Sequence, residues 1–121
     1  MLASIKGQTE IARALIDAKA DANAKDENGD TALKEASGKG STEIVRALID
    51  AKVDLNAKDT NVGFTALVVA VIEGQTEIVR MLLNARADPN AKTNDGHTAL
   101  MLASLKGNTE MVRMLKESGA Q

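Results

Sequence analysis

The chain repeats itself at intervals of 33 to 34 residues. The pattern Gly-x-Thr-Ala-Leu begins at Gly29, Gly63 and Gly96. A second pattern, Gly-x-Thr-Glu followed by Ile or Met, begins at Gly7, Gly40, Gly74 and Gly107. A period in this range is typical of stacked-repeat architectures, in which each unit buries its apolar face against its neighbours. The sequence therefore predicts four units, of which the first lacks its opening.

Each unit has the pattern of two short helices followed by a polar turn. In the third unit, Thr65 is placed to cap a first helix over residues 66–73, which Gly74 ends. A second helix is expected over residues 77–85, where apolar residues recur at helical spacing and Thr76 is placed to cap. The following stretch, residues 87–96, is rich in Asp, Asn, Pro and Gly, as projecting turns are.

These patterns, with Ala-Asp-x-Asn at Ala20 and Ala87, resemble ankyrin repeats over essentially the whole chain. The resemblance implies an all-α fold, a solenoid of stacked helix-turn-helix units with projecting β-turn or hairpin loops. One domain is then expected over residues 1–121. Its units would be a truncated repeat at 1–28, two repeats at 29–62 and 63–95, and a C-terminal capping repeat at 96–121.

One departure from the family pattern concerns the residue after each second helix. Lys19, Lys52 and Arg86 stand where the family favours glycine, and Gly119 alone keeps it. If the backbone there is left-handed, each larger side chain costs about 1 to 2 kcal/mol. The resemblance therefore predicts positive φ angles at these non-glycine positions.

Composition excludes several classes of function. The formal net charge is -2, and the 15 Lys and Arg residues are spread through every unit, so neither nucleic acid nor an anionic membrane is expected as a partner. The longest apolar run, residues 66–72, is far shorter than the roughly 20 residues that span a bilayer, so no membrane insertion is expected. The chain has no cysteine, which excludes disulfides and thiolate metal sites and is compatible with an intracellular, reducing compartment.

The sequence offers little to an enzyme. His97 is the only histidine, so an acid-base pair or a histidine metal site would rest on one residue. The acidic stretch 26–30 lacks the glycine and the final acid of a calcium loop. Residues 38–41 lack the spacing of a phosphate-binding loop. We expect no catalysis, no metal and no cofactor.

By resemblance, the turn tips and the exposed sides of the first helices form a concave face that binds a protein partner. The candidate contacts are Asp30, Phe64 and His97 at the tips, with Ile5, Lys39, Ile72, Glu73, Leu105 and Lys106 on the helices. For Phe64, the only aromatic residue, two interpretations stay open: a partner contact, or packing onto Val68 and Val69 between repeats.

Two further expectations concern the array as a whole. The open side of the first unit would favour self-association through the N-terminal end. Besides protein binding, two other roles remain alternatives: an engineered or structural scaffold without a natural ligand, and a fragment of a larger multidomain protein.

Overall fold

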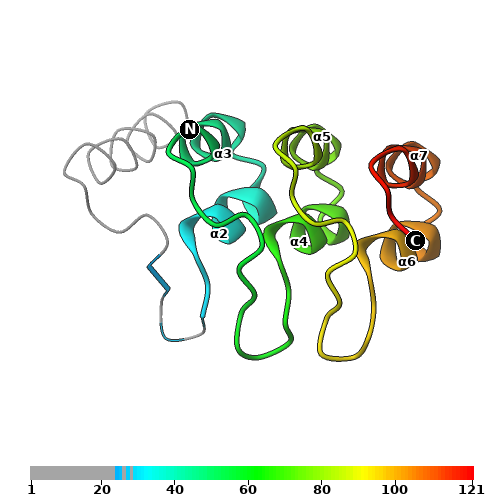
Figure 1. The fold of residues 1–121 in the computed structure, drawn as a ribbon, viewed down its shortest axis with the longest axis horizontal. Helices are drawn as coiled ribbons and strands as arrows, with labels where there is room; N and C mark the ends of the chain where they lie inside the picture. The colour runs from blue at the N-terminus through cyan, green and yellow to red at the C-terminus, as the bar shows by residue number, and fades with distance from the viewer. Residues whose placement is uncertain (1–23, 26, 28) are drawn as a thin grey trace.

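The computed structural model describes residues 24, 25, 27 and 29–121, which form six α-helices and no strand. The helices pair as α2 (Ala32–Lys39) with α3 (Thr42–Asp50), α4 (Ala66–Ile72) with α5 (Thr76–Asn84), and α6 (Ala99–Leu105) with α7 (Thr109–Glu117). Figure 1 shows the pairs side by side, with α2, α4 and α6 in one row, α3, α5 and α7 in a second, and long loops projecting beyond the first row. This arrangement confirms the expected all-α repeat solenoid.

The first helix of each pair begins at a threonine cap. The hydroxyl groups of Thr31, Thr65 and Thr98 each accept a hydrogen bond, 3.2 Å long, from the backbone N–H three residues later. This satisfies one of the donors that a helix start leaves without an intrahelical partner. The cap expected at Thr65 is therefore confirmed.

The cap expected at Thr76 is wrong. Thr76 is the first residue of α5, and the capping position belongs to Gln75, whose side chain makes no capping hydrogen bond. The Gln75 side chain does not cap because it bonds to the preceding repeat instead: its Nε2 donates to the carbonyl oxygen of Gly38 at 3.2 Å.

The apolar core runs between the repeats rather than sitting at one centre. Helices α2, α4 and α6 contact one another in order, as do α3, α5 and α7. The side chains that are at most 1% exposed come from both rows, and the largest are Leu33, Val45, Leu67, Val71, Ile78, Val79, Leu82, Met111 and Leu115. Each repeat thus depends on its neighbours to bury its apolar surface. Among the described helices, none has the length and apolar character needed to cross a bilayer.

Close approach of α2 to α4 explains a glycine inside a helix. A Cβ atom added at Gly38 would lie 2.9 Å from Cγ1 of Val69, closer than real contacts allow. Glycine costs a helix interior about 1 kcal/mol relative to alanine, and here it lets the two helices pack. Next to Val69, Val68 is 2% exposed, so the apolar character of α4 at this position belongs to the stack.

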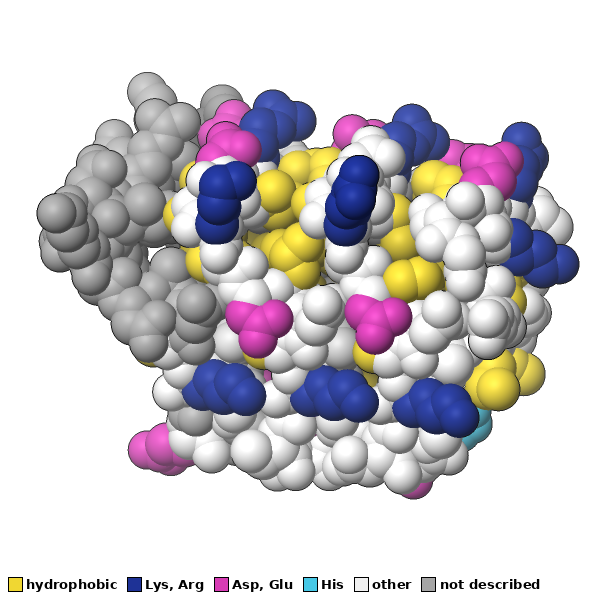
Figure 2. Space-filling view, viewed as in Figure 1, with side chains coloured by type: hydrophobic (Ala, Val, Ile, Leu, Met, Phe, Trp, Pro, Cys, Tyr) yellow, Lys and Arg dark blue, Asp and Glu magenta, His cyan; other side chains and the backbone are white. Residues whose placement is uncertain are grey.

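Adjacent projecting loops also bond to one another along the stack. The Lys25 and Lys58 ammonium groups donate to the carbonyl oxygens of Lys58 and Lys92, at 3.2 and 2.7 Å. Figure 2 shows that basic and acidic side chains form separate rows along the face in view, with apolar side chains in the hollows between repeats. On the described part of this face, rows of opposite sign therefore lie next to one another.

The backbone after the second helices is left-handed, as expected. Lys52 and Arg86 have φ angles of 60° and 71°, and Gly119, at the corresponding position, has 97°. Lys19 lies outside the described residues. Because a side chain with a Cβ atom is strained in this conformation, the sequence stores avoidable strain at the two described positions.

Replacing Lys52 by glycine should therefore stabilise the protein. Relief of strain, partly offset by the greater chain entropy of glycine when unfolded, leaves a gain of about 0.5 to 1 kcal/mol and raises the melting temperature by a few degrees. Thermal unfolding measures the shift. Lys92→Gly is the control, because Lys92 is exposed, lies in a loop and lacks a positive φ. A lower melting temperature for Lys52→Gly than for the parent chain would contradict the assignment.

Candidate functional site

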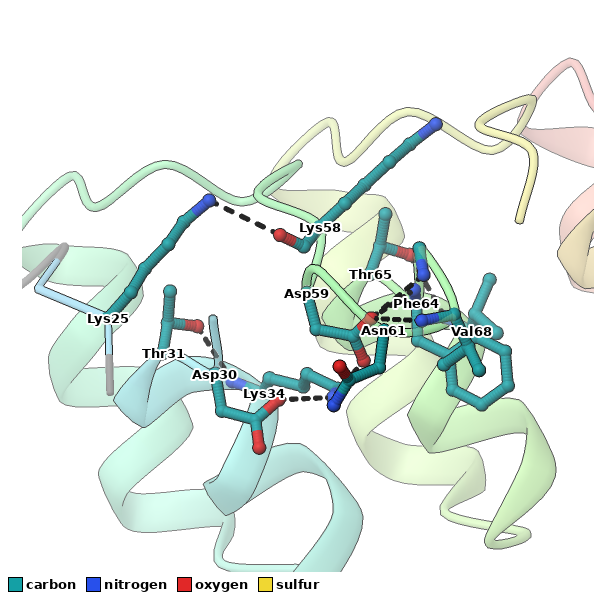
Figure 3. A network of polar contacts seen from close by, with 12 residues as sticks. Lys25, Asp30, Thr31, Lys34, Lys58, Asp59, Asn61, Phe64, Thr65 and Val68 are labelled. Atoms are coloured by element: carbon teal, nitrogen blue, oxygen red, sulfur yellow. Dashed lines mark hydrogen bonds and ion pairs between the residues drawn. The ribbon is translucent and has the colours of Figure 1, made fainter. Parts of the chain in front are cut away.

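A partly buried ion network holds the first two described loop tips together (Figure 3). The Lys34 ammonium group contacts the carboxylates of Asp30, four residues earlier, and of Asp59 in the next loop. Asp59 is 8% exposed, and its Oδ1 accepts hydrogen bonds from the backbone N–H groups of residues 62–64 at 2.8 to 3.4 Å. The shape of the loop that carries Phe64 therefore depends on two side chains of the preceding repeat, the carboxylate of Asp59 and the ammonium group of Lys34.

The network keeps both partners charged. Burial by itself raises the pKa of Asp59, but hydrogen bonds from Lys34 and the backbone N–H groups outweigh it and lower the pKa to about 2. For Lys34, burial acts to lower the pKa, and the hydrogen bonds to Asp30 and Asp59 reverse the effect and raise it. Both side chains therefore stay charged over the pH range in which most proteins are folded.

Beside this network, a shallow groove lies between α2 and α4. Its walls carry charges of both signs and its floor is apolar. The lining residues are Asp30, Lys34, Glu35, Gly38, Lys39, Val69 and Glu73. Glu35 and Lys39 stand one helical turn apart, and both are exposed, as is Glu73 at the C-terminal cap of α4. The groove brings together three of the residues expected to contact a partner: Asp30, Lys39 and Glu73.

The other expected contacts are distributed differently. Phe64 and Ile72 are partly buried and pack against the apolar core, which leaves only part of each side chain available. His97 and Leu105 line a second depression at the end of the stack, and Lys106 is exposed next to it. Ile5 lies outside the described residues, as does the N-terminal surface expected to self-associate.

Seven lining residues of these two surfaces were not among the contacts expected from the sequence: Lys34, Glu35, Gly38 and Val69 in the groove, and Leu100, Met101 and Ser104 in the second depression. Glu35 had a signal, since it precedes Lys39 by four residues on the same helix. Met101 corresponds to Val68. This position is buried inside the stack and exposed at its end, a difference that only the three-dimensional structure shows.

Within the described residues, no cluster of three or more His, Cys, Asp or Glu side chains is placed to hold a metal ion. No curated protein matches the chain. A family model described as ankyrin repeats (3 copies) matches residues 1–93 and 60–121. The two matches together cover the whole sequence, and the stacked helix pairs are the arrangement that the repeat period predicts. The chain belongs to the ankyrin repeat family.

Proposed function

We propose that this chain is a non-catalytic module that binds a protein partner through the groove between α2 and α4 and the loop tips beside it. Ankyrin repeats generally act as protein–protein interaction modules and are typically non-catalytic. The observation that carries the proposal is the groove itself, in which exposed Glu35, Lys39 and Glu73 surround an apolar floor at Val69.

The chemistry of the groove favours a protein over a nucleic acid or a lipid surface. Acidic and basic side chains stand within one groove, so a complementary ligand must itself carry both signs and an apolar group between them. Peptide segments meet this requirement, whereas a polyanion meets repulsion from Asp30, Glu35 and Glu73. The groove is built on two helices joined by packing, so little ordering entropy opposes binding.

The proposed contact surface extends beyond the groove. Partly exposed Phe64 and Ile72 supply apolar area next to it, and His97, Leu105 and Lys106 continue the same side of the array along α6. Ile5 would belong to the corresponding position of the first repeat. We further propose an intracellular location, for which the absence of cysteine is the chemical support.

A charge-exchange pair tests this proposal. The double variant Lys39→Glu/Glu73→Lys keeps the net charge and reverses both signs in the groove, so it should abolish specific binding without changing the melting temperature. The matched control, Glu43→Lys/Arg113→Glu, reverses two exposed charges on α3 and α7 in the second row. Partners are captured from a cell lysate by the parent chain, identified by mass spectrometry, purified and titrated against both variants.

The proposal requires that affinity for the purified partner falls by at least about tenfold for the groove variant and stays near the parent value for the control. Equal affinity of the two double variants would place the binding surface elsewhere.

A further inference from the structure

The outward side of α6, which faces away from α4, carries apolar side chains that nothing in the described part of the chain covers. Leu105 is 77% exposed and Met101 is 47% exposed. Together with His97, Leu100 and Ser104 they line a shallow depression. Figure 2 shows this hydrophobic surface beside the histidine side chain at the right-hand end of the stack. We call Leu100, Met101, Ser104 and Leu105 the end patch.

The inner repeats show what kind of element covers such a patch. Counting from the Gly-x-Thr-Ala-Leu pattern, Leu100, Met101 and Ser104 correspond to Leu67, Val68 and Val71 of α4. Those three side chains are at most 2% exposed. Among the described helices of the first row, α4 has α2 and α6 as neighbours, whereas α6 contacts only α4. Met101 and Ser104 are exposed in α6 and Leu100 is partly exposed, so these are the positions that a following helix covers.

The second row offers a following helix less apolar surface at this end than the first row does. Leu83 of α5 lies at the junction with Met114 of α7 and offers an apolar side chain to the next repeat. The corresponding residue of α7 is Lys116, which is exposed and is followed by exposed Glu117. A helix stacked on α7 would desolvate these charges, which is costly unless each finds a partner. At this end of the stack, burial under a further helix is therefore favourable over α6 but not over α7.

We propose that the end patch docks one amphipathic helix of a partner protein, lying alongside α6 as α6 lies alongside α4. The apolar stripe of that helix rests on Leu100, Met101 and Leu105, and its polar side faces solvent. This contact continues the helix-to-helix packing of the first row, which the three described repeats already establish. The end patch shares Leu105 with the contact surface of the proposed function, but this docking does not require the groove between α2 and α4.

A second copy of this chain is a poorer occupant. α6 has seven residues, and only two of them are large apolar side chains with strong exposure. Two such helices face to face offer far less than the about 800 Å² that each partner buries in a standard stable interface.

The probe for this proposal is a synthetic peptide with the sequence of residues 98–107, the helix that covers the matching surface of α4. In the peptide, Met101 is replaced by lysine and Leu105 by glutamate, so that the peptide has no apolar side facing away from the protein. A lactam between the two new side chains, one helical turn apart, holds a helix that would otherwise be too short to form in water. The protein is labelled with ¹³C-methyl methionine. The methyl resonance of Met101 reports binding at the end patch, and that of Met81 in α5 serves as the internal reference.

Peptide titration should shift the Met101 methyl resonance saturably and leave Met81 unchanged. Leu105→Glu in the protein should weaken the affinity by about tenfold or more, since it replaces buried apolar area by a charge. Val62→Glu is the control, because Val62 is the remaining exposed large hydrophobic residue in the described part of the chain and lies in the loop before α4, outside the end patch. It should leave the affinity unchanged.

Three results would overturn the proposal: no shift at Met101, equal affinity of the Leu105→Glu and Val62→Glu proteins, or a dimer in sedimentation of the protein alone that Leu105→Glu dissociates. The last result would assign the end patch to a second copy. The Lys39→Glu/Glu73→Lys protein should bind the peptide normally, which separates failure here from failure of the groove.

Discussion

Replacing Lys34 by valine should lower the free energy of unfolding by about 3 kcal/mol, because it removes one partner of a buried ion pair and leaves the other. The Lys34 and Asp59 side chains are 14% and 4% exposed, so solvent does little to compensate either charge. Chemical denaturation in urea measures the loss as a lower midpoint at constant slope.

The chain supplies its own substitute for this pair one repeat later. Val68 and Thr93 occupy the positions that correspond to Lys34 and Asp59, and both are buried. The double variant Lys34→Val/Asp59→Thr should therefore be more stable than the sum of the two single losses implies, by at least about 1.5 kcal/mol. Recovery stays partial, because the Asp59 carboxylate also holds the N–H groups of residues 62–64, in a loop one residue longer than the next. Strict additivity of the two losses would contradict direct coupling.

The pH dependence follows from the same pair. The pKa of Asp59 is lowered in the folded protein to about 2, from an ordinary value of 3.8. Its stabilising contribution is therefore fully present above about pH 4 and is lost as the pH falls towards 2. The difference in stability between the parent chain and Lys34→Val should narrow over this acidic range and stay constant near neutrality.

Much of the fold could be predicted from local chemistry. The threonine caps at Thr31, Thr65 and Thr98 depend on residues within one helical turn, so the sequence alone places the starts of the first helices. The left-handed backbone at Lys52 and Arg86 follows from the repeat register. Contacts between residues far apart in the chain were harder to predict. Lys34 and Asp59 are 25 residues apart within the repeat at 29–62, and nothing in the sequence of that repeat shows that one reaches the other.

Surface ion pairs and the candidate sites show the same limit. Glu77 and Arg80 share a helix, yet Arg80 bonds to Glu110 of the next repeat at 3.2 Å, because stacking brings α7 beside α5. Position in the stack, rather than residue type, decides exposure: Val68 is covered and Met101 is not. A sequence pattern can name the positions that face a neighbour, but the presence of that neighbour is a three-dimensional fact.

Contact between adjacent loops gives the second large expected effect, at Gly63. Its φ of 74° is strained for any residue with a Cβ atom, and an added Cβ would lie 2.5 Å from Oδ1 and 3.0 Å from the backbone nitrogen of Asn94. Asn94 cannot withdraw freely, because its backbone N–H donates to the carbonyl oxygen of Val62 at 2.9 Å and its Nδ2 to that of Asn61 at 3.2 Å. Gly63→Ala should therefore cost about 2 to 3 kcal/mol, the sum of backbone strain and a forced separation of the two loops.

Gly96→Ala isolates the part of this cost that comes from packing. Gly96 holds the same position one repeat later, with a φ of 81°, and an added Cβ there meets no atom within 4 Å. It should lose only the strain, about 1 kcal/mol. The double variant Gly63→Ala/Asn94→Ala lacks the clashing Oδ1 of Asn94. Adding Asn94→Ala to the Gly63→Ala protein should therefore lower the free energy of unfolding by less than Asn94→Ala does in the parent chain. Equal losses for Gly63→Ala and Gly96→Ala, measured by urea unfolding, would show that the loops do not touch in solution. A larger loss at Gly63 would establish that the loops, and not the helices alone, join one repeat to the next.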